Sequence, residues 1–239
     1  MFNQKNPYFA PTDKRVLIVA GHYGSGKTEF SVSLAMHLAE LNRGTGKKLA
    51  LVDLDIANPY FRSRERRKLL EEYGIKVYAD VYDSEITAEL PALSAEIRKP
   101  LEDDSTYVIV DVGGNDAGAR VLNQFKRYCA GDHLFLTVIN ANRPETRDLE
   151  GAVYHLESIR HETGLAPDGI INNCHLLMET TANTVKKGHK LCEEVSKATG
   201  IPIFCDCYPE PLVKREDLEG LSEHLMPIKM YMRESWLDK

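Results

Sequence analysis

Seven short, almost continuous apolar runs recur along the chain, and the segments between them are amphipathic at helical spacing. The runs cover residues 15–20, 48–53, 75–79, 107–111, 133–139, 168–172 and 201–205. Runs of this length, rich in Val, Ile and Leu, are typical of strands buried on both faces of a parallel sheet. Strands that alternate with helices are joined by right-handed crossovers. The pattern therefore predicts an α/β fold: a doubly wound, mostly parallel sheet with helices on both faces.

Each of the expected helices buries one stripe of apolar residues. In two of them these residues lie three or four positions apart: Phe30, Leu34, Leu38 and Leu41 in one, and Leu149, Val153, Leu156 and Ile159 in the other. Such stripes face the core and imply no cofactor. Because the chain has 239 residues, of which 43% are hydrophobic, we expect a single domain over residues 1–239, with residues 1–13 flexible.

Composition and charge disfavour several classes of protein. The formal net charge of −6 removes the broad attraction on which non-specific nucleic-acid binders rely, so we do not expect nucleic acid as the main substrate. The five cysteines show no paired framework, as in a reduced cytoplasmic protein. The first residues lack the apolar core of a signal peptide, and no apolar run approaches the roughly 20 residues that cross a bilayer. We therefore expect a cytoplasmic protein without a membrane span.

The first apolar run leads into the glycine-rich stretch "GHYGSGKTEF". Its glycines, lysine and threonine fit the pattern GxxxxGK[ST], and the stretch lies between an expected strand and an expected helix. In this context loop N–H groups and the helix N-terminus bind phosphates, the lysine reaches the terminal phosphate, and the threonine holds Mg²⁺. The residues expected to bind the nucleotide here are Gly21, His22, Tyr23, Gly24, Ser25, Gly26, Lys27, Thr28 and Glu29.

Acidic residues close two further expected strands. Asp53 and Asp55 are one residue apart, so in an extended segment both would point toward the crevice at the carboxyl ends of the strands. Asp111 ends another run, in "DVGG", and is positioned to organise the Mg²⁺ shell, while Gly113 and Gly114 would let backbone N–H groups approach a γ-phosphate. Together with the phosphate loop, these motifs predict a nucleoside triphosphatase site.

The order of these motifs resembles that of the P-loop ATPases of the MinD and ParA family, which is related to CobQ/CobB-type and nitrogenase iron protein-type nucleotide-binding domains. The resemblance covers nearly the whole chain. It implies that Asp55 polarises the attacking water, that Asp53 supports the metal beside Thr28 and Asp111, and that "DVGG" is the second switch. It also implies that two chains form a homodimer across their nucleotides.

Two later segments carry the resemblance toward the base of the nucleotide. "DGIINN", residues 168–173, is similar to the family segment whose last Asn binds the base, which implies this role for Asn173. "IPIFCDCYPEPL", residues 201–212, resembles the strand and loop that wrap the adenine, which implies that Pro209 and Glu210 contact it.

The chain departs from the family at two positions. MinD and ParA relatives carry an extra lysine early in the loop that reaches into the partner's phosphates, and here His22 or Gly21 stands there. Arg62 or Arg64, beyond the first switch, is a candidate substitute for that charge. The cysteine that binds the cluster in the nitrogenase iron protein is replaced by the Ala-Gly-Ala of residues 117–119, which disfavours an iron–sulfur reductase.

The identity of the base follows from a missing carboxylate. A guanine-reading NKxD motif needs an Asp three residues beyond its Asn, to accept hydrogen bonds from the ring N–H and the exocyclic amine. Three residues beyond Asn173 stands Leu176, and three beyond Asn172 stands His175. We therefore expect ATP in preference to GTP, although both asparagines could also simply cap a strand.

These observations predict a Mg²⁺-dependent ATPase that binds ATP and ADP and whose nucleotide state switches its conformation or its protein partner. An ATP-dependent small-molecule kinase or an amide-forming synthetase would use the same sheet and loop. A GTP-driven metallochaperone is a third interpretation, which the missing guanine-reading Asp disfavours. Cys205 and Cys207 share one face of a strand, where buried packing residues are commoner than a metal site shared by two copies. The C-terminal "LSEHLMPIKMYMRESW" has roughly helical apolar spacing and is interpreted as a packing element.

Overall fold

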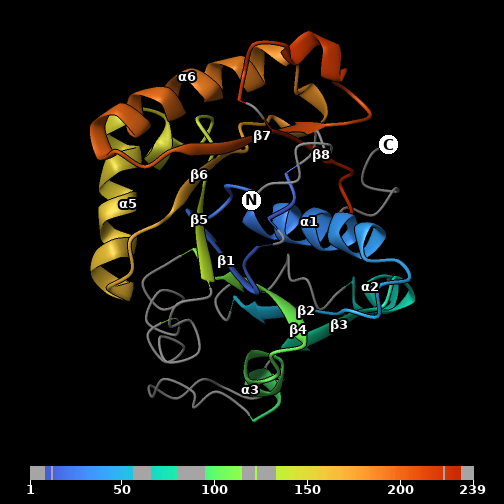
Figure 1. Ribbon diagram of the computed structural model, residues 1–239. Coiled ribbons are helices and arrows are strands. Elements are labelled where there is room, and N and C mark those ends of the chain that lie inside the picture. The colour runs from blue at the N-terminus through green and yellow to red at the C-terminus, as the bar shows by residue number, and fades with distance from the viewer. Residues whose placement is uncertain are drawn as a thin grey trace, which may run out of the picture.

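The structure is a computed structural model and describes residues 9–11, 13–55, 66–79, 95–114, 122, 133–222 and 224–232. Eight strands form one sheet in the order β3-β2-β4-β1-β5-β6-β7-β8, and all neighbouring strands are parallel (Figure 1). The strands are β1 (Val16–Gly21), β2 (Lys48–Leu54), β3 (Ile75–Ala79), β4 (Thr106–Val112), β5 (His133–Ile139), β6 (Gly169–Asn172), β7 (Ile203–Pro209) and β8 (Leu225–Ile228).

The helices cover both faces of this sheet. They are α1 (Lys27–Leu41), α2 (Arg67–Glu72), α3 (Ala95–Glu102), α5 (Leu149–Thr163) and α6 (Ala182–Thr199), with 3₁₀ turns η3 (Pro144–Thr146), η4 (Leu177–Glu179) and η5 (Arg215–Leu218). Apolar residues of α1 and α2 share one core with the sheet, whereas α3, α5 and α6 pack on the opposite face. In Figure 1, α1 and α3 accordingly lie on opposite sides of β2 and β4. The predicted doubly wound α/β fold is confirmed.

Local sequence accounts for where the longest helices begin and end. Asp148 caps α5 by accepting a hydrogen bond from Gly151 N, and Thr181 and Thr184 form a capping box at the start of α6. Both helices end at a glycine in the left-handed conformation, Gly164 with φ 59° and Gly200 with φ 76°. Side-chain caps and C-terminal glycines satisfy the backbone groups that a helix leaves without partners.

Two segments differ from the interpretation of the sequence. Part of the C-terminal stretch forms β8 at the edge of the sheet, where Pro227 is tolerated because an edge strand needs fewer backbone donors. Residues 9–11, within the segment expected to be flexible, are buried, and the Phe9 ring packs against Phe30 and Phe204 at centroid distances of 6.3 and 6.1 Å. None of the helices in the described ranges combines the length and the apolar character that crossing a membrane requires.

The sheet brings the predicted motifs together at the carboxyl ends of its strands. β1 lies between β4 and β5, and β4 lies between β1 and β2. The order in which successive strands are added to the sheet therefore reverses beside β1. Asp53 of β2 and Asp111 of β4 are partners in the strand register. Ligands of open α/β sheets bind in the crevice at such a point, beyond the carboxyl ends of the strands.

Candidate functional site

The glycine-rich loop joins β1 to α1 and turns tightly through two left-handed residues. Gly24 has φ 75° and Gly26 has φ 82°, a conformation that side chains with a Cβ rarely adopt. Ser25 N donates to His22 O at 3.0 Å, and Phe30 N donates to Gly26 O at 2.9 Å as α1 begins. The loop thus places Lys27 and Thr28 in the first turn of α1, where the helix N-terminus favours an anion.

Lys27 is buried against an acidic residue at the end of β2. Its Nζ lies 3.0 Å from Asp55 Oδ2, and the two side chains are 4% and 2% exposed. Asp53 Oδ1 accepts a hydrogen bond from Asp55 N at 3.0 Å, which fixes the turn that follows β2. The predicted catalytic residues Lys27 and Asp55 are therefore in direct contact, with Asp53 holding the backbone of Asp55.

The residues predicted to surround Mg²⁺ include one fully buried carboxylate. Asp111 Oδ1 accepts a hydrogen bond from Ser31 Oγ at 3.4 Å, while its Oδ2 has no hydrogen-bond partner among the described residues. Burial raises the pKa of Asp111 to about 7, although the nearby Lys27 charge and the Thr28 hydroxyl act in the opposite direction. A buried carboxylate oxygen without a partner, close to a threonine hydroxyl, is a donor set that suits Mg²⁺.

The described residues contain no ready-made cage for a metal ion. No group of three or more His, Cys, Asp or Glu side chains in these ranges is arranged to hold one. Mg²⁺ is commonly held by one or two protein groups together with substrate phosphates and water. When bound, Mg²⁺ would neutralise phosphate charge, and Thr28, Asp111 and Asp53 are the residues predicted to hold it.

Gly114, predicted to approach a γ-phosphate, packs against the backbone of the phosphate loop. A Cβ built on Gly114 would lie 2.7 Å from Tyr23 N and 2.8 Å from Gly21 O. Both neighbours are backbone atoms and cannot rotate away, so the close approach of the two loops requires glycine here. The end of β4 and the beginning of the phosphate loop therefore form one surface.

The remaining loop residues have different surroundings. Tyr23 is 60% exposed, whereas Ser25 is fully buried and its Oγ has no hydrogen-bond partner in the described part of the chain. His22 Nδ1 lies 2.9 Å from Tyr23 O and 3.8 Å from Glu145 Oε2. Its ring packs edge-on against His155 of α5 at a centroid distance of 5.2 Å.

A hollow of about 170 Å³ opens beside the second half of the loop, and Asn173 lies on its wall. Asn173 Nδ2 donates to Ser25 O at 2.9 Å, which leaves Oδ1 as the acceptor of this side chain. Pro209 at the end of β7 lines the same hollow, together with apolar residues of the C-terminal segment such as Met230 and Met232. The residues predicted to bind the base, Asn173 and Pro209, are thus brought to one cavity.

Two predicted binding residues have other partners. Both carboxylate oxygens of Glu29 accept backbone hydrogen bonds, from Tyr231 N at 2.6 Å and from Met232 N at 2.9 Å. Burial raises the pKa of Glu29, and these hydrogen bonds oppose the rise. Glu29 lines the hollow beside Asn173 and ties α1 to the C-terminal segment. Glu210 lies outside the wall of that hollow, 3.8 Å from Lys229 Nζ.

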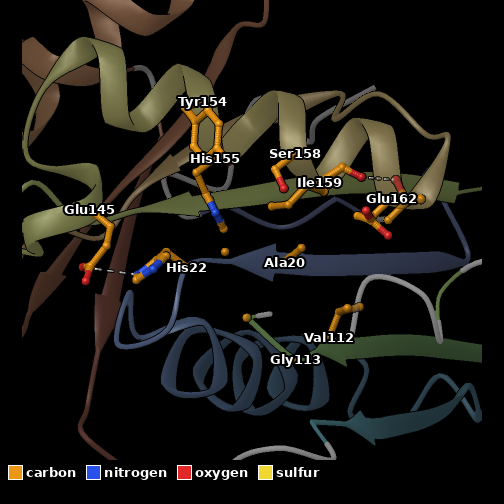
Figure 2. Close-up of a pocket in the computed structure, with 13 residues that line it drawn as sticks. Ala20, His22, Val112, Gly113, Glu145, Tyr154, His155, Ser158, Ile159 and Glu162 are labelled. Atoms are coloured by element: carbon orange, nitrogen blue, oxygen red, sulfur yellow. Dashed lines mark hydrogen bonds and ion pairs between the residues drawn. The ribbon is translucent and has the colours of Figure 1, made fainter. Parts of the chain in front are cut away.

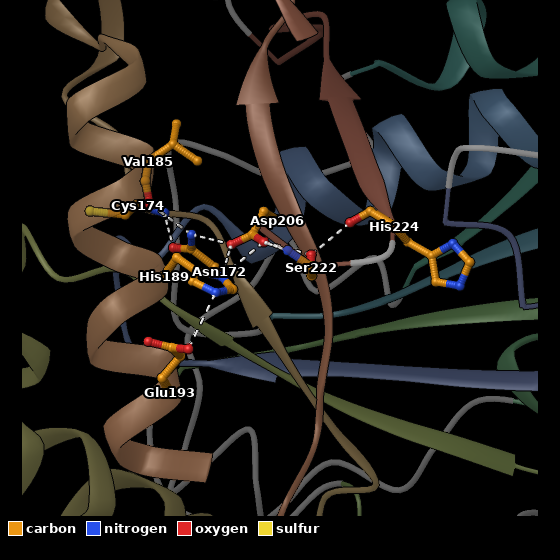
Figure 3. A network of polar contacts seen from close by, with 8 residues as sticks. All are labelled: Asn172, Cys174, Val185, His189, Glu193, Asp206, Ser222 and His224. Atoms are coloured by element: carbon orange, nitrogen blue, oxygen red, sulfur yellow. Dashed lines mark hydrogen bonds and ion pairs between the residues drawn. The ribbon is translucent and has the colours of Figure 1, made fainter. Parts of the chain in front are cut away.

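Asn172, the neighbour of Asn173, belongs to a buried polar network instead (Figure 3). Its Nδ2 donates to Asp206 Oδ1 at 2.6 Å and to Val185 O at 3.0 Å. Asp206, on β7, also accepts hydrogen bonds from Ser222 N and Oγ, and His189 Nδ1 of α6 lies 3.0 Å from both of its oxygens. This network holds β6 and β7 together. Asn173 directly follows β6 and Pro209 ends β7, so the network also positions these two residues at the cavity.

Cys205 and Cys207 flank Asp206 within the core. They are 0% and 1% exposed, and burial raises the pKa of the Cys205 thiol well above its ordinary value. Burial also opposes formation of the thiolate that zinc requires. Their surroundings are therefore those of packing residues.

One charged residue near the loop was missed by the analysis of the sequence. Arg143 follows β5, and its Nε donates to Gly24 O at 2.7 Å. A Cβ on Gly24 would lie 2.9 Å from the Arg143 guanidinium carbon, so the guanidinium lies flat against the loop. No carboxylate of the described residues forms an ion pair with it. Only the fold shows that the exit of β5 reaches a loop 119 residues earlier. Arg62 and Arg64, the candidates from the sequence, lie outside the described residues.

Comparisons with known proteins relate the chain to others through its structure. No protein-family model matches it, and no curated protein sequence matches it. It is similar to the cell division protein ftsY from Thermotoga maritima, with 22% identity and a TM-score of 0.54 over 84% of this chain and 64% of that one. It is similar to the signal recognition particle 54 kDa protein from Aeropyrum pernix, solved in complex with GDP, with 25% identity and a TM-score of 0.53 over 84% of this chain and 43% of that one.

A third solved structure, the chloroplast FtsY from Physcomitrella patens, is 17% identical, with a TM-score of 0.52 over 85% of this chain and 61% of that one. The chain thus spans between 43% and 64% of the length of these three relatives. The resemblance to MinD and ParA stays a prediction. The parallel sheet, the loop between β1 and α1 and these structural likenesses agree, and the chain has the α/β fold of the P-loop nucleoside triphosphatases.

Proposed function

We propose that the protein binds a Mg²⁺–nucleoside triphosphate at the loop between β1 and α1 and hydrolyses it slowly, as a nucleotide-dependent switch. The observation that carries this proposal is the buried contact between Lys27 and Asp55 at the start of α1. Among the described residues, the buried ammonium group of Lys27 at the helix N-terminus forms an ion pair with Asp55, which the phosphates of a nucleotide would replace. Binding would therefore release Asp55 from Lys27.

This exchange gives the two residues complementary roles. Lys27 and the loop N–H groups would neutralise the charge that develops on the transferred phosphoryl group. Asp55, freed from the ammonium group, would orient the attacking water. Because Asp55 directly follows β2, the contact with Lys27 also couples the end of that strand to the presence of nucleotide. A change of this kind is the basis of a switch.

Arg143 supplies a positive charge from within the same chain. The family lysine expected near position 22 is missing, and the guanidinium of Arg143 lies against Gly24 of the same loop. A fixed arginine beside the phosphates stabilises the charge of the transition state. We propose that Arg143 performs this task, so that turnover does not depend on a lysine from a partner chain.

We propose ATP as the preferred nucleotide. The one carboxylate on the described wall of the cavity beside Asn173 is that of Glu29, and both of its oxygens already accept backbone hydrogen bonds. Guanine would therefore find no free carboxylate there for its ring N–H and exocyclic amine. Asn173 Oδ1 can accept one hydrogen bond from the exocyclic amine of adenine. The GDP bound to the 54 kDa relative belongs to that protein.

Calorimetry with Mg²⁺-ATP tests the proposed site. Lys27→Ala should weaken binding by about 10- to 100-fold, the value of a hydrogen bond to a charged group, and should abolish hydrolysis. Lys190→Ala removes an exposed lysine from α6 and is the matched control, with binding and turnover unchanged. Equal ATP affinity in the wild type and in Lys27→Ala would show that the loop does not bind the nucleotide.

We also propose that the protein forms a homodimer. Light scattering with and without nucleotide tests this proposal.

A further inference from the structure

A second and larger hollow lies on the other side of the phosphate loop. Its volume is about 520 Å³, within the range of small-molecule sites. It is bounded by the end of β1 and the beginning of the loop, by the end of β4 at Gly113 and Gly114, and by one side of α5. Figure 2 shows the His155 side chain directed toward the nearby His22 ring, with Glu145 on the other side of His22.

The two hollows share the loop but not the same part of it. The smaller one is lined by Gly24, by Gly26 to Glu29 and by Asn173, which suits the base of the nucleotide. The larger one is lined by Gly21, His22 and Gly114, next to the segment expected to contact a γ-phosphate. A nucleotide with its base beside Asn173 and its phosphates across the loop would therefore direct its terminal phosphate toward the larger hollow. This step rests on the proposed function.

The contacts of His22 define which of its ring nitrogens can act on a bound molecule. A carbonyl oxygen only accepts hydrogen bonds, so Nδ1, 2.9 Å from Tyr23 O, carries a proton. Glu145 Oε2, 3.8 Å from the same nitrogen, favours this arrangement. In the neutral ring Nε2 then has the free lone pair and is the basic atom.

We propose that the larger hollow is an acceptor site, where a small alcohol receives the terminal phosphoryl group with His22 as the general base. The alcohol oxygen forms a bond to the γ-phosphorus, and the bond from that phosphorus to the β–γ bridging oxygen breaks. The electron pair of the broken bond leaves with the nucleoside diphosphate. The hydroxyl proton passes to His22 Nε2 and then to solvent. Without an alcohol, water oriented by Asp55 attacks the same phosphorus, which gives slow hydrolysis.

The charges of the wall define the class of alcohol. The described lining residues include two carboxylates, Glu145 and Glu162, and no lysine or arginine. An acceptor that carries a phosphate or carboxylate would find no lysine or arginine on this described wall to pair with, and would meet like charges at short range. A neutral alcohol, or one that carries an amine, fits these surroundings. Ser158 adds a hydroxyl group for hydrogen bonds with such a molecule.

The test uses the full chain with Mg²⁺-ATP and defined alcohols. Glycerol, erythritol and ethanolamine represent the neutral and amine-bearing class, and glycerate and glycerol phosphate represent the anionic class. ADP formation is measured together with ³¹P NMR of the products. At least one member of the first class should raise ADP formation and give an equal amount of a phosphomonoester, and the anionic alcohols should give none. No phosphomonoester from any member of the first class, or transfer only to the anionic class, overturns the proposal.

Two variants connect the transfer to His22. His22→Asn keeps a donor for Tyr23 O but lacks the basic Nε2, and the alcohol-dependent rate should fall by about 100-fold or more, a larger factor than that for hydrolysis without alcohol. His161→Asn changes an exposed histidine of α5 outside the hollow and is the matched control. An equal fall of both rates in His22→Asn overturns the base role. Calorimetry with Mg²⁺-ATP on the same samples separates the two proposals. If the wild-type protein does not bind ATP, the proposed nucleotide site is wrong. If it binds ATP but transfers no phosphoryl group, only the acceptor site is wrong.

Discussion

Lys27 Nζ lies 3.0 Å from Asp55 Oδ2 in a buried contact that joins the start of α1 to the end of β2. The two residues are 28 positions apart in the sequence, and their predicted roles are separate, one at the phosphate and one at the attacking water. In the absence of a phosphate, the ammonium group of Lys27 and the carboxylate of Asp55 therefore neutralise each other's charge. In the proposed function, nucleotide binding and the position of Asp55 are therefore linked through one ammonium group.

The first prediction concerns Asp55→Asn. Loss of one member of a buried ion pair costs about 3 kcal/mol, so the Tm of the protein without nucleotide should fall by roughly 5–10 °C. Mg²⁺-ATP should recover much of this loss, because its phosphates supply the missing negative charge, while hydrolysis should fall by about 100-fold or more. Scanning calorimetry with and without nucleotide measures the first effect, and phosphate release measures the second. Asp217→Asn, on the exposed face of η5, is the control. Wild-type hydrolysis by Asp55→Asn would exclude this residue from the mechanism.

The second prediction concerns Arg143. Arg143→Ala should lower kcat by about 100-fold or more while ATP affinity changes by less than about tenfold, because the guanidinium would act mainly on the transition state. Arg143→Lys should recover little, since a lysine cannot both donate to Gly24 O and lie flat on the loop. Arg147→Ala removes an arginine that is paired with Asp148 on the surface and should leave kcat unchanged. An Arg143→Ala protein with wild-type kcat would mean that the guanidinium only supports the loop.

The third prediction concerns the base. ATP should bind at least about tenfold more tightly than GTP, since the one carboxylate on the described wall of the cavity beside Asn173, that of Glu29, already accepts backbone hydrogen bonds. Inosine triphosphate shares the oxygen at position 6 of guanine but lacks the 2-amino group. It should bind as weakly as GTP if Asn173 Oδ1 accepts from the amine of adenine. Competition against a fluorescent ATP analogue measures all three, and tighter binding of GTP than of ATP would contradict this assignment.

The fourth prediction concerns the pH dependence of stability at the network of His189 and Asp206. The hydrogen bond to the Asp206 carboxylate raises the pKa of His189 above 6.5, against the effect of burial, and Glu193 adds to the rise. Burial alone would raise the pKa of Asp206, but hydrogen bonds from His189, Ser222 and Asn172 outweigh it, and its pKa lies below 3.8. The contribution of His189 is fully present below pH 6.5 and is lost as the pH rises through its raised pKa. That of Asp206 is present above pH 3.8 and is lost as the pH falls through its lowered pKa.

His189→Gln should therefore lower the Tm more at about pH 6 than at about pH 9, because only the charged imidazole gains from the carboxylate. The measurement is thermal unfolding followed by circular dichroism at both pH values. His161→Gln, on the exposed face of α5, should show the same Tm as the wild type at each pH. A loss in His189→Gln that is equal at both pH values would show that the network stabilises the protein through packing and neutral hydrogen bonds.

The strands from β1 to β7, their alternation with helices and the loop between β1 and α1 could be predicted from the sequence. These features depend on patterns within a few neighbouring residues: continuous apolar runs, helical spacing and the order of Gly26, Lys27 and Thr28. β8 was missed because it has only four residues and contains Pro227, so that its pattern resembles neither a regular strand nor a clear helix.

Which of these residues come into contact depends on the three-dimensional fold and could not be predicted from the sequence. The crossovers of the sheet bring Arg143 to Gly24 and Asp55 to Lys27, and no local pattern encodes such distant pairs. They also separate two neighbours: Asn173 contacts the phosphate loop, while Asn172 is buried against Asp206. Successive residues at the end of a strand point in different directions, and the partner of each depends on which strand lies beside it in the sheet. The chemistry of the candidate site therefore follows from strand order, which a linear sequence specifies only through the fold as a whole.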